Sequence, residues 1–324
     1  MSERVVLAYS GDPDSSAAIR WFAERTRAEV VAITVDLGQG GEDLAAVRRR
    51  ALDCGAVEAV VTDARDEFAE QYCLPALQAN ALPPVPALSR PMIAKHLVAA
   101  ADQFGANAVA HGCAGEHGHL EADVRALAPR LGVVSPGRGH HDVGGKAHCA
   151  IERNIWGRSA ETVPTQDVWG TPDAEELTIT FDRGVPVAID GETVTVLQAI
   201  RELNLRAGVH GVGTAASYQA PGAITLITAH RELEAATLEP DLARFKSTVG
   251  HRWSELVEDG LWFSPFKDAL DAFVADSQQQ VSGEVRIALH EGRAIVRERP
   301  WRAPDLPTWY DSSERELGQF CGQA

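Results

Sequence analysis

Short apolar runs alternate with helix-period segments along the first 135 residues of the chain. In the first helical segment, Ala17, Ala18, Trp21 and Phe22 fall on one face. The expected strands are Arg4–Tyr9, Glu29–Val35, Ala56–Thr62 and Ala108–His111, and the expected helices are Ser16–Arg25, Leu44–Cys54, Glu67–Ala79 and Arg90–Phe104. This alternation predicts an α/β fold in which helices cover both faces of a parallel sheet and ligands bind at the carboxyl ends of the strands.

The pattern of expected helices and strands changes in the second half of the sequence. Residues 129–146 are rich in glycine, proline and histidine, and we interpret them as a loop or domain boundary. Two strand pairs are expected beyond them: Leu177–Phe181 with Pro186–Ile189, and Val285–Leu289 with Ala294–Arg297. The expected helices are Val194–Asn204, Ala223–Ala236, Pro240–Glu258 and Pro265–Gln279. We therefore expect a first domain over residues 1–160, an α+β domain over 161–300 and a polar tail over 301–324.

The amino-acid composition restricts the kinds of molecule that this protein is expected to bind. The chain has 324 residues, and 45% of them are apolar, as in an ordinary packed domain. Its 30 Lys and Arg against 46 Asp and Glu give a formal net charge of −16. Such an acidic surface repels phosphate backbones and anionic lipid, so neither nucleic acid nor a membrane is expected as a partner. No apolar stretch is long enough to span a bilayer.

Cysteine usage and the N-terminal residues indicate the compartment. The five cysteines, at positions 54, 73, 113, 149 and 321, are odd in number and form no Cys-x-x-Cys pair. Neither a disulfide framework nor a structural zinc site is therefore expected. The first strand leads into a Gly/Asp turn rather than into the small-residue cleavage site of a secretory signal. We expect a reduced, cytoplasmic protein.

The most specific local signal, residues 8–16, lies between the first strand and the first helix. A tight turn of small residues at a helix N-terminus directs several backbone N–H groups at one anion. Ser10, Ser15 and Ser16 add hydroxyl donors, and Asp14 can cap the helix or hold a magnesium ion. An ordinary strand–turn–helix with a Ser/Asp cap also fits these residues.

This segment resembles the pyrophosphate-binding loop, Ser-Gly-Gly-x-Asp-Ser/Thr-Ser, of the PP-loop ATP pyrophosphatases, a Rossmann-like class that forms adenylated intermediates. Further segments are similar, in order along the chain, to the argininosuccinate synthetase family. They are residues 32–40, 76–82, 90–95, 109–113, 124–129, 154–159, 210–213, 228–234 and 260–265. The resemblance covers essentially the whole chain, and it implies a nucleotide-binding domain followed by a synthetase and multimerisation domain.

The activity that the resemblance implies is a C–N ligase reaction of arginine biosynthesis. Family members adenylate citrulline with ATP, release pyrophosphate, and then let the amino group of aspartate displace AMP. The resemblance implies ATP and Mg²⁺ as cofactors, small-molecule substrates and a homotetramer. It places nucleotide contacts at Ala8, Tyr9, Ser10, Gly11, Asp12, Asp14, Ser15, Ser16, Val35 and Gly112. Asp14 and Ser16 are the catalytic candidates, and the substrate candidates are Arg90, Ser159 and Tyr218.

Departures from the family pattern point to changed substrates. Asp12 stands where the loop has its second glycine, and a carboxylate beside a polyphosphate is unfavourable unless a cation offsets it. The aspartate-binding stretch is replaced by the shorter segment 114–119, which lacks the family's ligands. The citrulline loops are shortened at residues 83–86 and before Tyr218, and Gln219 replaces a glutamate. We expect substrates that lack one charged end of an α-amino acid.

Histidines offer a second chemistry. Five of the eleven lie within 32 residues, at positions 117, 119, 140, 141 and 148. They fit either a transition-metal site or exposed, inert loop residues, and we assign no metal ligand. Asp36 could either coordinate a ligand or serve as a turn residue at the end of its strand. His230 and Arg231 match a motif of the family, but on a helix they could equally have a structural role.

The sequence is consistent with three functions. The first is a ligase that uses citrulline and aspartate. The second, from another class, is a catalytically silent nucleotide-binding paralogue with a structural or regulatory role. The third keeps the adenylation and changes both substrates. The retained loop residues Ser10, Asp14, Ser15 and Ser16 favour an enzyme, whereas the shortened loops favour changed substrates.

Overall fold

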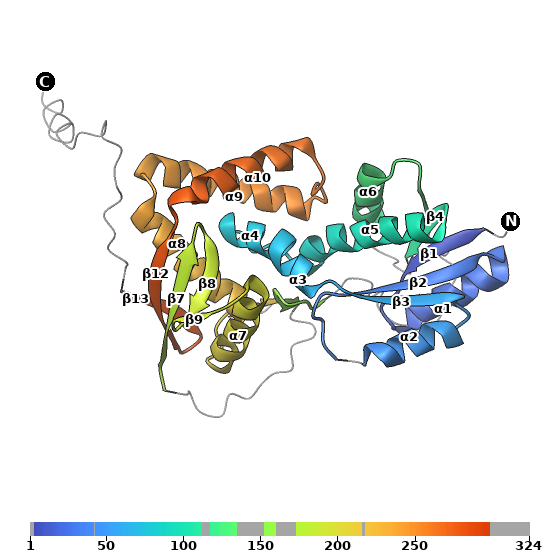
Figure 1. Cartoon of the computed structure of the whole chain (residues 1–324), viewed down its shortest axis with the longest axis horizontal. Coiled ribbons are helices and arrows are strands. Elements are labelled where there is room, and N and C mark those ends of the chain that lie inside the picture. Colours follow the sequence, from blue (N-terminus) through green and yellow to red (C-terminus); the bar gives the residue numbers. More distant parts are fainter. Residues whose placement is uncertain are drawn as a thin grey trace, which may run out of the picture.

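The structure, a computed structural model, describes residues 3–41, 43–111, 117–134, 152–159, 173–215 and 218–298. A parallel sheet lies at one end of the molecule and an antiparallel sheet at the other, with helices between them (Figure 1). Within the described ranges, no helix is both long and apolar enough to cross a membrane. The α/β class expected from the hydrophobic pattern is confirmed.

The parallel sheet has its strands in the order β3-β2-β1-β4-β5. They are β1 (Arg4–Ala8), β2 (Glu29–Asp36), β3 (Glu58–Asp63), β4 (Ala108–His111) and β5 (Gly132–Val134). The direction in which successive strands are added reverses beside β1, so the loops after β1 and β4 diverge to opposite faces. In doubly wound sheets such a switch point opens the crevice in which ligands bind.

Both faces of this sheet are covered. Val30 and Ala32 of β2 belong to the apolar cluster shared with α1 (Pro13–Trp21) and α2 (Leu44–Asp53). Val31 and Ile33, which alternate with them, belong to the cluster shared with α5 (Val85–Phe104). Because successive side chains of a strand point to opposite faces, a strand buried on both sides is a continuous apolar run.

Two expected helices differ at their bounds or in their winding. The helix expected from Arg90 begins at Val85, because prolines fit the first turn of a helix, where no intrahelical N–H is needed. The segment expected as Glu67–Ala79 divides into α3 (Arg65–Phe68), a π-helical turn at Ala69–Cys73 and α4 (Leu74–Gln78). Another π-helical turn, Phe22–Thr26, continues α1.

The expectation of a loop or boundary over residues 129–146 is wrong at its start. Strand β5 lies within that segment and pairs in parallel with β4. A three-residue strand is too short to show periodicity, and the edge of the sheet decides its conformation. Helix α6 (His117–Leu127) was also not expected, because its first turn contains the His-Gly-His sequence of a loop. Most of residues 129–146 lie outside the described ranges.

The second half contains the antiparallel sheet, in the order β13-β12-β7-β8-β9. Its strands are β7 (Glu175–Asp182), β8 (Val185–Ile189), β9 (Glu192–Thr193), β12 (Gly283–His290) and β13 (Arg293–Glu298). The two expected strand pairs are confirmed: β7 pairs with β8, and β12 pairs with β13. β12 also pairs with β7, which joins both hairpins into one sheet.

Four long helices accompany this sheet. They are α7 (Val196–Val209), α8 (Pro221–Thr237), α9 (Pro240–Glu258) and α10 (Pro265–Ser277), the last followed by a 3-10 turn at Gln278–Gln280. Local capping fixes several of their starts. The Thr195 hydroxyl accepts a bond from the backbone N–H of Gln198 in a capping box, and Ser264 caps α10.

A third, small sheet has three strands in the order β10-β11-β6. Its strands are β6 (Arg158–Ser159), β10 (Thr214–Ala215) and β11 (Tyr218–Gln219). A tight turn with the fully buried Trp156 precedes β6. A backbone hydrogen bond of 2.9 Å, from Ile155 N to Leu37 O, connects this turn to the loop after β2. The turn therefore holds the small sheet against the carboxyl edge of the parallel sheet.

Candidate functional site

A cavity of about 1210 Å³ lies at the carboxyl edge of the parallel sheet. Its walls include the loops after β1 and β2, the end of β4 and the segment around β6. Helices α1 and α2 also contribute to it, with single residues of α3, α5 and α7. Pockets for drug-sized ligands measure about 300–1000 Å³, so this cavity has room for a nucleotide and part of a second molecule. The sequence-predicted residues that line it are Ala8, Tyr9, Ser10, Gly11, Asp12, Ser15, Ser16 and Val35.

Gly11 allows the loop after β1 to turn into α1. It has a φ of +86°, in the left-handed region that favours glycine, and an added Cβ would lie 3.1 Å from the Val47 side chain. The Arg50 guanidinium donates a hydrogen bond to the carbonyl of Gly11 from the facing helix α2. Ser10 at the tip of the loop is exposed, whereas Ser15 and Ser16 are buried at the first turn of α1.

Asp12, rather than Asp14, is the N-cap of α1. Its Oδ1 accepts the backbone N–H of Ser15 at 2.7 Å, and its Oδ2 accepts the hydroxyl of Ser10. Of the two roles considered for Asp14, capping of this helix is therefore excluded, because a cap must precede the first helical residue, Pro13. Asp14 lies in the first turn and is not among the residues that line the cavity. The Asp12 carboxylate thus occupies an N–H group of the kind that a phosphate would bind.

Ser16 connects the loop to the strand before it. Its hydroxyl lies 3.0 Å from the hydroxyl of Tyr9, and both side chains are buried. Burial raises the pKa of Tyr9 above its ordinary value, against the opposing hydrogen bond with Ser16. Tyr9 therefore stays protonated and serves as a fixed hydrogen-bonding neighbour of Ser16 rather than as a base.

The loop after β2 forms the second wall. The Asp36 carboxylate accepts the N–H of Gly38 at 2.8 Å and lies 3.5 Å from Nε of Arg65, so Asp36 acts here as a turn residue. Gly38 permits close approach of the neighbouring turn, because an added Cβ would lie 2.2 Å from the Ile155 side chain. Val35, just before this loop, is buried and lines the cavity.

The end of β4 completes this side of the cavity. His111 is buried there and is one of the lining residues. Gly112, the other expected nucleotide contact, lies outside the described residues.

Arginines gather in this cavity, which sequence reasoning did not foresee. Those that line it are Arg20, Arg50, Arg65, Arg153, Arg158 and Arg201. The acidic residues that line it are Asp12, Asp36 and Glu152, so the cavity is basic although the chain carries a net charge of −16. The only earlier signal was that Arg158 lies within a family-like segment, next to Ser159.

The substrate candidates are placed differently from one another. Ser159 and Tyr218 are direct cross-strand partners in the small sheet, but neither is among the residues that line the cavity. Arg158 and Gln219 form the adjacent cross-strand pair, and Arg158 does line it. Since neighbouring residues of a strand face opposite sides, Ser159 and Tyr218 lie on the other face of the ribbon. Arg90, on α5, donates a hydrogen bond to the carbonyl of Glu258 at 3.3 Å and is also not a lining residue.

Two buried polar groups lie near these candidates. Burial raises the pKa of Tyr218, and its hydroxyl has no hydrogen-bond partner among the described residues. Asp123 on α6 is buried with both carboxylate oxygens unpartnered in the same ranges, and burial raises its pKa to about 7 against the opposing charge of Arg90. Neither group lines the cavity.

The histidines form no metal site within the described residues. His140, His141 and His148 lie outside those ranges, and no group of three or more potential metal ligands occurs within them. His230 is fully buried away from the cavity, where its ring nitrogens lie 2.7 Å from Oδ1 of Asn80 and 2.8 Å from Oε1 of Gln278. It belongs to a structural network rather than to the cavity.

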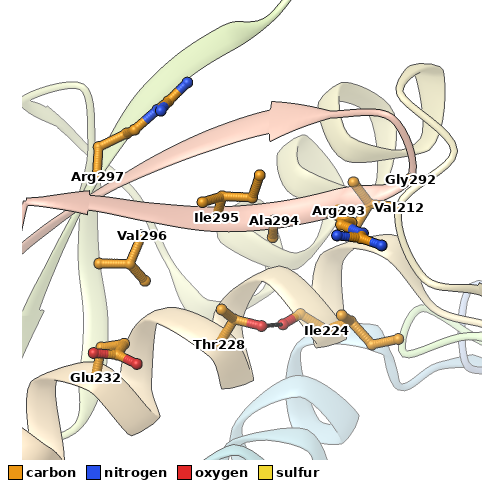
Figure 2. A pocket seen from close by; sticks show the side chains of 10 residues that line it. All are labelled: Val212, Ile224, Thr228, Glu232, Gly292, Arg293, Ala294, Ile295, Val296 and Arg297. Atoms are coloured by element: carbon orange, nitrogen blue, oxygen red, sulfur yellow. Dashed lines mark hydrogen bonds between the residues drawn. The ribbon is translucent and has the colours of Figure 1, made fainter.

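A second pocket, of about 620 Å³, lies between α8 and strand β13 (Figure 2). Ile224 and Thr228 of α8 face Ala294 and Val296 of β13 across it. The Thr228 hydroxyl is already bonded, at 2.7 Å, to the carbonyl of Ile224. No residue predicted as a site from the sequence lines this pocket.

Comparison with family models matches nearly the whole chain. Residues 4–154 match the Arginosuccinate synthase N-terminal HUP domain, and residues 149–306 match the Arginosuccinate synthase C-terminal domain. The first match contains the parallel sheet and most of the arginine-lined cavity. The second contains the antiparallel sheet and the small sheet that supplies Arg158.

Proposed function

The chain belongs to the argininosuccinate synthase family, and on that premise we propose that it is an ATP-dependent ligase. In this proposal the enzyme adenylates an acceptor, releases pyrophosphate, and then couples the acceptor to an amine with release of AMP. The observation that carries the proposal is the serine-rich loop after β1, at the N-terminus of α1, facing a cavity with six arginines. A helix N-terminus and guanidinium groups are the two protein features that best suit phosphate.

The residues of the loop have distinct roles in this proposal. MgATP, when bound, supplies the adenylyl group and a leaving pyrophosphate. The backbone N–H group of Gly11 would bind a phosphate oxygen, and the N–H of Ser15 and the hydroxyl of Ser10 would do so in competition with the Asp12 carboxylate. Asp14, in the first turn of α1 beside the cavity lining, is the residue that would hold the magnesium ion. Val35, at the end of β2, contacts the adenine. The buried bond between Tyr9 and Ser16 keeps the first turn in place.

The proposed enzyme differs from its family in the substrates that it uses. We propose that citrulline and aspartate are replaced by molecules that lack a charged end, because the family's ligand loops are shortened. Ser159, Tyr218 and Arg90 are retained and remain the family-type substrate candidates. We also propose that the enzyme is a homotetramer of the cytoplasm that binds neither nucleic acid nor membrane.

One observation favours the alternative of a silent nucleotide-binding paralogue. The Asp12 carboxylate accepts the N–H of Ser15 at 2.7 Å and so competes with a phosphate for that donor. Exchange of labelled pyrophosphate into ATP separates the two functions. A ligase catalyses this exchange when an acceptor is present, whereas a silent paralogue binds ATP and gives none.

The proposed nucleotide site is tested by the double variant Asp14→Ala/Ser16→Ala. At an ATP concentration about 100 times Kd, binding stabilises the folded protein by about 2.7 kcal/mol. The double variant should lose this stabilisation, measured as the rise in Tm with MgATP. Without ATP its Tm should also fall, because the change leaves the buried Tyr9 hydroxyl without its partner, which costs about 1–3 kcal/mol; the rise in Tm with MgATP is therefore compared within each protein. Glu24→Ala, an exposed change in the same helical stretch, is the control, and equal ATP stabilisation in the double variant and the parent would refute the site.

A further inference from the structure

Two arginines of the cavity face each other across a tight turn. Arg153 and Arg158 are paired by an antiparallel β-bridge, on either side of residues 154–157. Side chains directly opposite in such a pair lie on the same face, so two positive charges are held close together. The charge of Arg153 adds to burial in lowering the pKa of Arg158. Like charges in this arrangement are unfavourable unless an anion lies between them.

The turn that carries the pair is rigid. The Asn154 side chain accepts the N–H groups of Trp156 and Gly157 at 2.8 and 3.0 Å. Trp156 at the tip is completely buried. The side chain of Asn204, on α7, donates to the carbonyl of Ile155 at 2.7 Å. The two guanidinium groups are therefore carried by a fixed backbone, as a binding site requires.

No described acidic group neutralises the pair. Among the residues that the structure describes, neither Arg153 nor Arg158 forms a salt bridge, whereas Arg65 in the same cavity pairs with Asp36 and Asp63. The Arg158 Nε donates instead to the amide oxygen of Gln219, its cross-strand neighbour. Gln219 is fixed in turn by its own bond, of 3.2 Å, to the hydroxyl of Thr214. Gln219 thus orients Arg158 without cancelling its charge.

We infer that the Arg153–Arg158 pair binds a carboxylate of the second substrate, separately from the phosphate site at the loop after β1. Both residues line the cavity that this loop opens into. A pair of guanidinium groups matches the geometry of a carboxylate. The cavity has six arginines against three acidic residues, so it disfavours an ammonium group on the same molecule. The substrate class is therefore a small carboxylic acid or dicarboxylate without a free amino group. The binding of a carboxylate at this pair does not depend on the proposed function; only the description of the bound molecule as a substrate rests on it.

Succinate and L-aspartate are suitable probes, because they differ only in one ammonium group. Titration calorimetry at low ionic strength should show saturable binding of succinate to the parent protein, at least tenfold tighter than that of aspartate. Succinamide, which has no charge, should not bind. Raising the salt concentration should weaken succinate binding, since the contact is between charges at a solvent-open cavity.

Variants assign the binding to the pair. Arg153→Gln and Arg158→Met should each weaken succinate binding at least tenfold. Gln219→Glu, which adds a charge with almost no change in size, should weaken it by several fold or more. Arg244→Gln, an exposed arginine on α9, is the matched control and should stay within twofold of the parent. If Arg158→Met does not fold, the exposed Arg153→Gln still provides the test.

Binding of MgATP, measured on the same proteins, separates this inference from the proposed function. Its Kd should change less than twofold in the arginine variants. If MgATP binding weakens as much as succinate binding, the pair holds nucleotide phosphates and the inference is wrong. It is also wrong if the parent does not bind succinate below about 20 mM, a free energy too small for a built site, or if it prefers aspartate. If the parent binds succinate at the pair but never binds MgATP, the inference stands and the proposed function fails.

Discussion

At the scale of single residues, Asp12 and Asp123 are the two carboxylates whose environments matter most. Asp12 is an internal anion at the start of α1, where it accepts hydrogen bonds from Ser10 and Ser15. Asp123 is buried on α6 with no hydrogen-bond partner among the described residues. Hydrogen-bond donors stabilise the charged form of Asp12, whereas Asp123 has no such donors among the described residues. Substitution of Asp12 should therefore lower the stability of the protein slightly, and substitution of Asp123 should raise it.

Asp12→Gly should tighten ATP binding by a few-fold to tenfold, about 1 kcal/mol. The substitution removes a negative charge from the phosphate site and frees the N–H of Ser15. Its cost in stability is only a few tenths of a kcal/mol, because glycine is itself tolerated at an N-cap. Calorimetric titration with MgATP measures the effect. Weaker binding would mean instead that Asp12 holds magnesium or orders the loop.

Asp123→Asn should stabilise the protein at neutral and alkaline pH. Burial raises the pKa of Asp123 to about 7 from its ordinary value of 3.8, so the folded state favours the protonated acid. That contribution to stability is complete below about pH 4, and it is lost as the pH rises towards and through 7. The advantage of the variant should therefore grow by about 1.4 kcal/mol per pH unit between about pH 4 and 7, and then level off.

Urea unfolding at a series of pH values measures this difference. Glu121→Gln, on the same helix but bonded to Arg125 at the surface, is the control and should show no such growth. A constant difference between Asp123→Asn and the parent at all pH values would show that the buried acid does not titrate in this range.

At the scale of elements, a buried polar network joins α8 and α9 to the turn after α4 and to the 3-10 turn after α10. Nζ of Lys246 lies 2.6 Å from the Glu234 carboxylate, and these side chains are only 1% and 8% exposed. Glu234 also accepts bonds from Asn80 and Gln278. Burial lowers the pKa of Lys246, against the opposing attraction of Glu234. Through Asn80 the network connects the first half of the chain with two helices of the second half, so its loss should affect the whole fold.

Lys246→Met should destabilise the protein by about 3–5 kcal/mol, because it leaves the Glu234 carboxylate buried without its partner. The double variant Lys246→Met/Glu234→Gln should regain most of that loss, since it leaves no uncompensated charge. Urea midpoints of the parent, the single variant and the double variant give both values. If the two variants are equally unstable, the packing of the lysine stem matters and the charge does not.

At the scale of the whole molecule, charge is distributed unevenly. The chain carries a net charge of −16, yet six arginines converge on one cavity. Low-dielectric walls focus the field of such a cluster, which attracts small anions to a protein that otherwise repels them. This contrast supports substrates that are anionic overall rather than zwitterionic.

Citrulline and aspartate together with MgATP should accordingly be poor substrates. Each presents an ammonium group, and leaving that group unpaired in a basic cavity is unfavourable by several kcal/mol. Formation of AMP and pyrophosphate, followed by a coupled assay, should show a turnover far below 1 s⁻¹ at millimolar substrate. Turnover of about 1 s⁻¹ or faster, ordinary for an enzyme on its own reaction, would mean that the missing loops are not needed.

Local patterns in the sequence determined the fold class and most of the helices and strands. Strands β1, β2 and β4 are nearly continuous apolar runs because both faces of the parallel sheet are buried. Helix α9 was predicted with its observed bounds, Pro240–Glu258, since its proline start and amphipathic period are local properties. The strand, turn and helix N-terminus that form the proposed phosphate loop were also predictable, because they are contiguous in the chain.

Only the tertiary structure decided how distant residues meet. Arg20, Arg50, Arg158 and Arg201 are spread over 182 residues, counted inclusively, and no spacing in the sequence links them. Strand β5 exists because β4 offers it an edge. Ser159 and Arg158 are neighbours in sequence, yet the alternation of the strand turns only Arg158 towards the cavity. Secondary structure follows from short-range sterics and periodicity, whereas the charge and lining of a cavity depend on which elements the fold brings side by side.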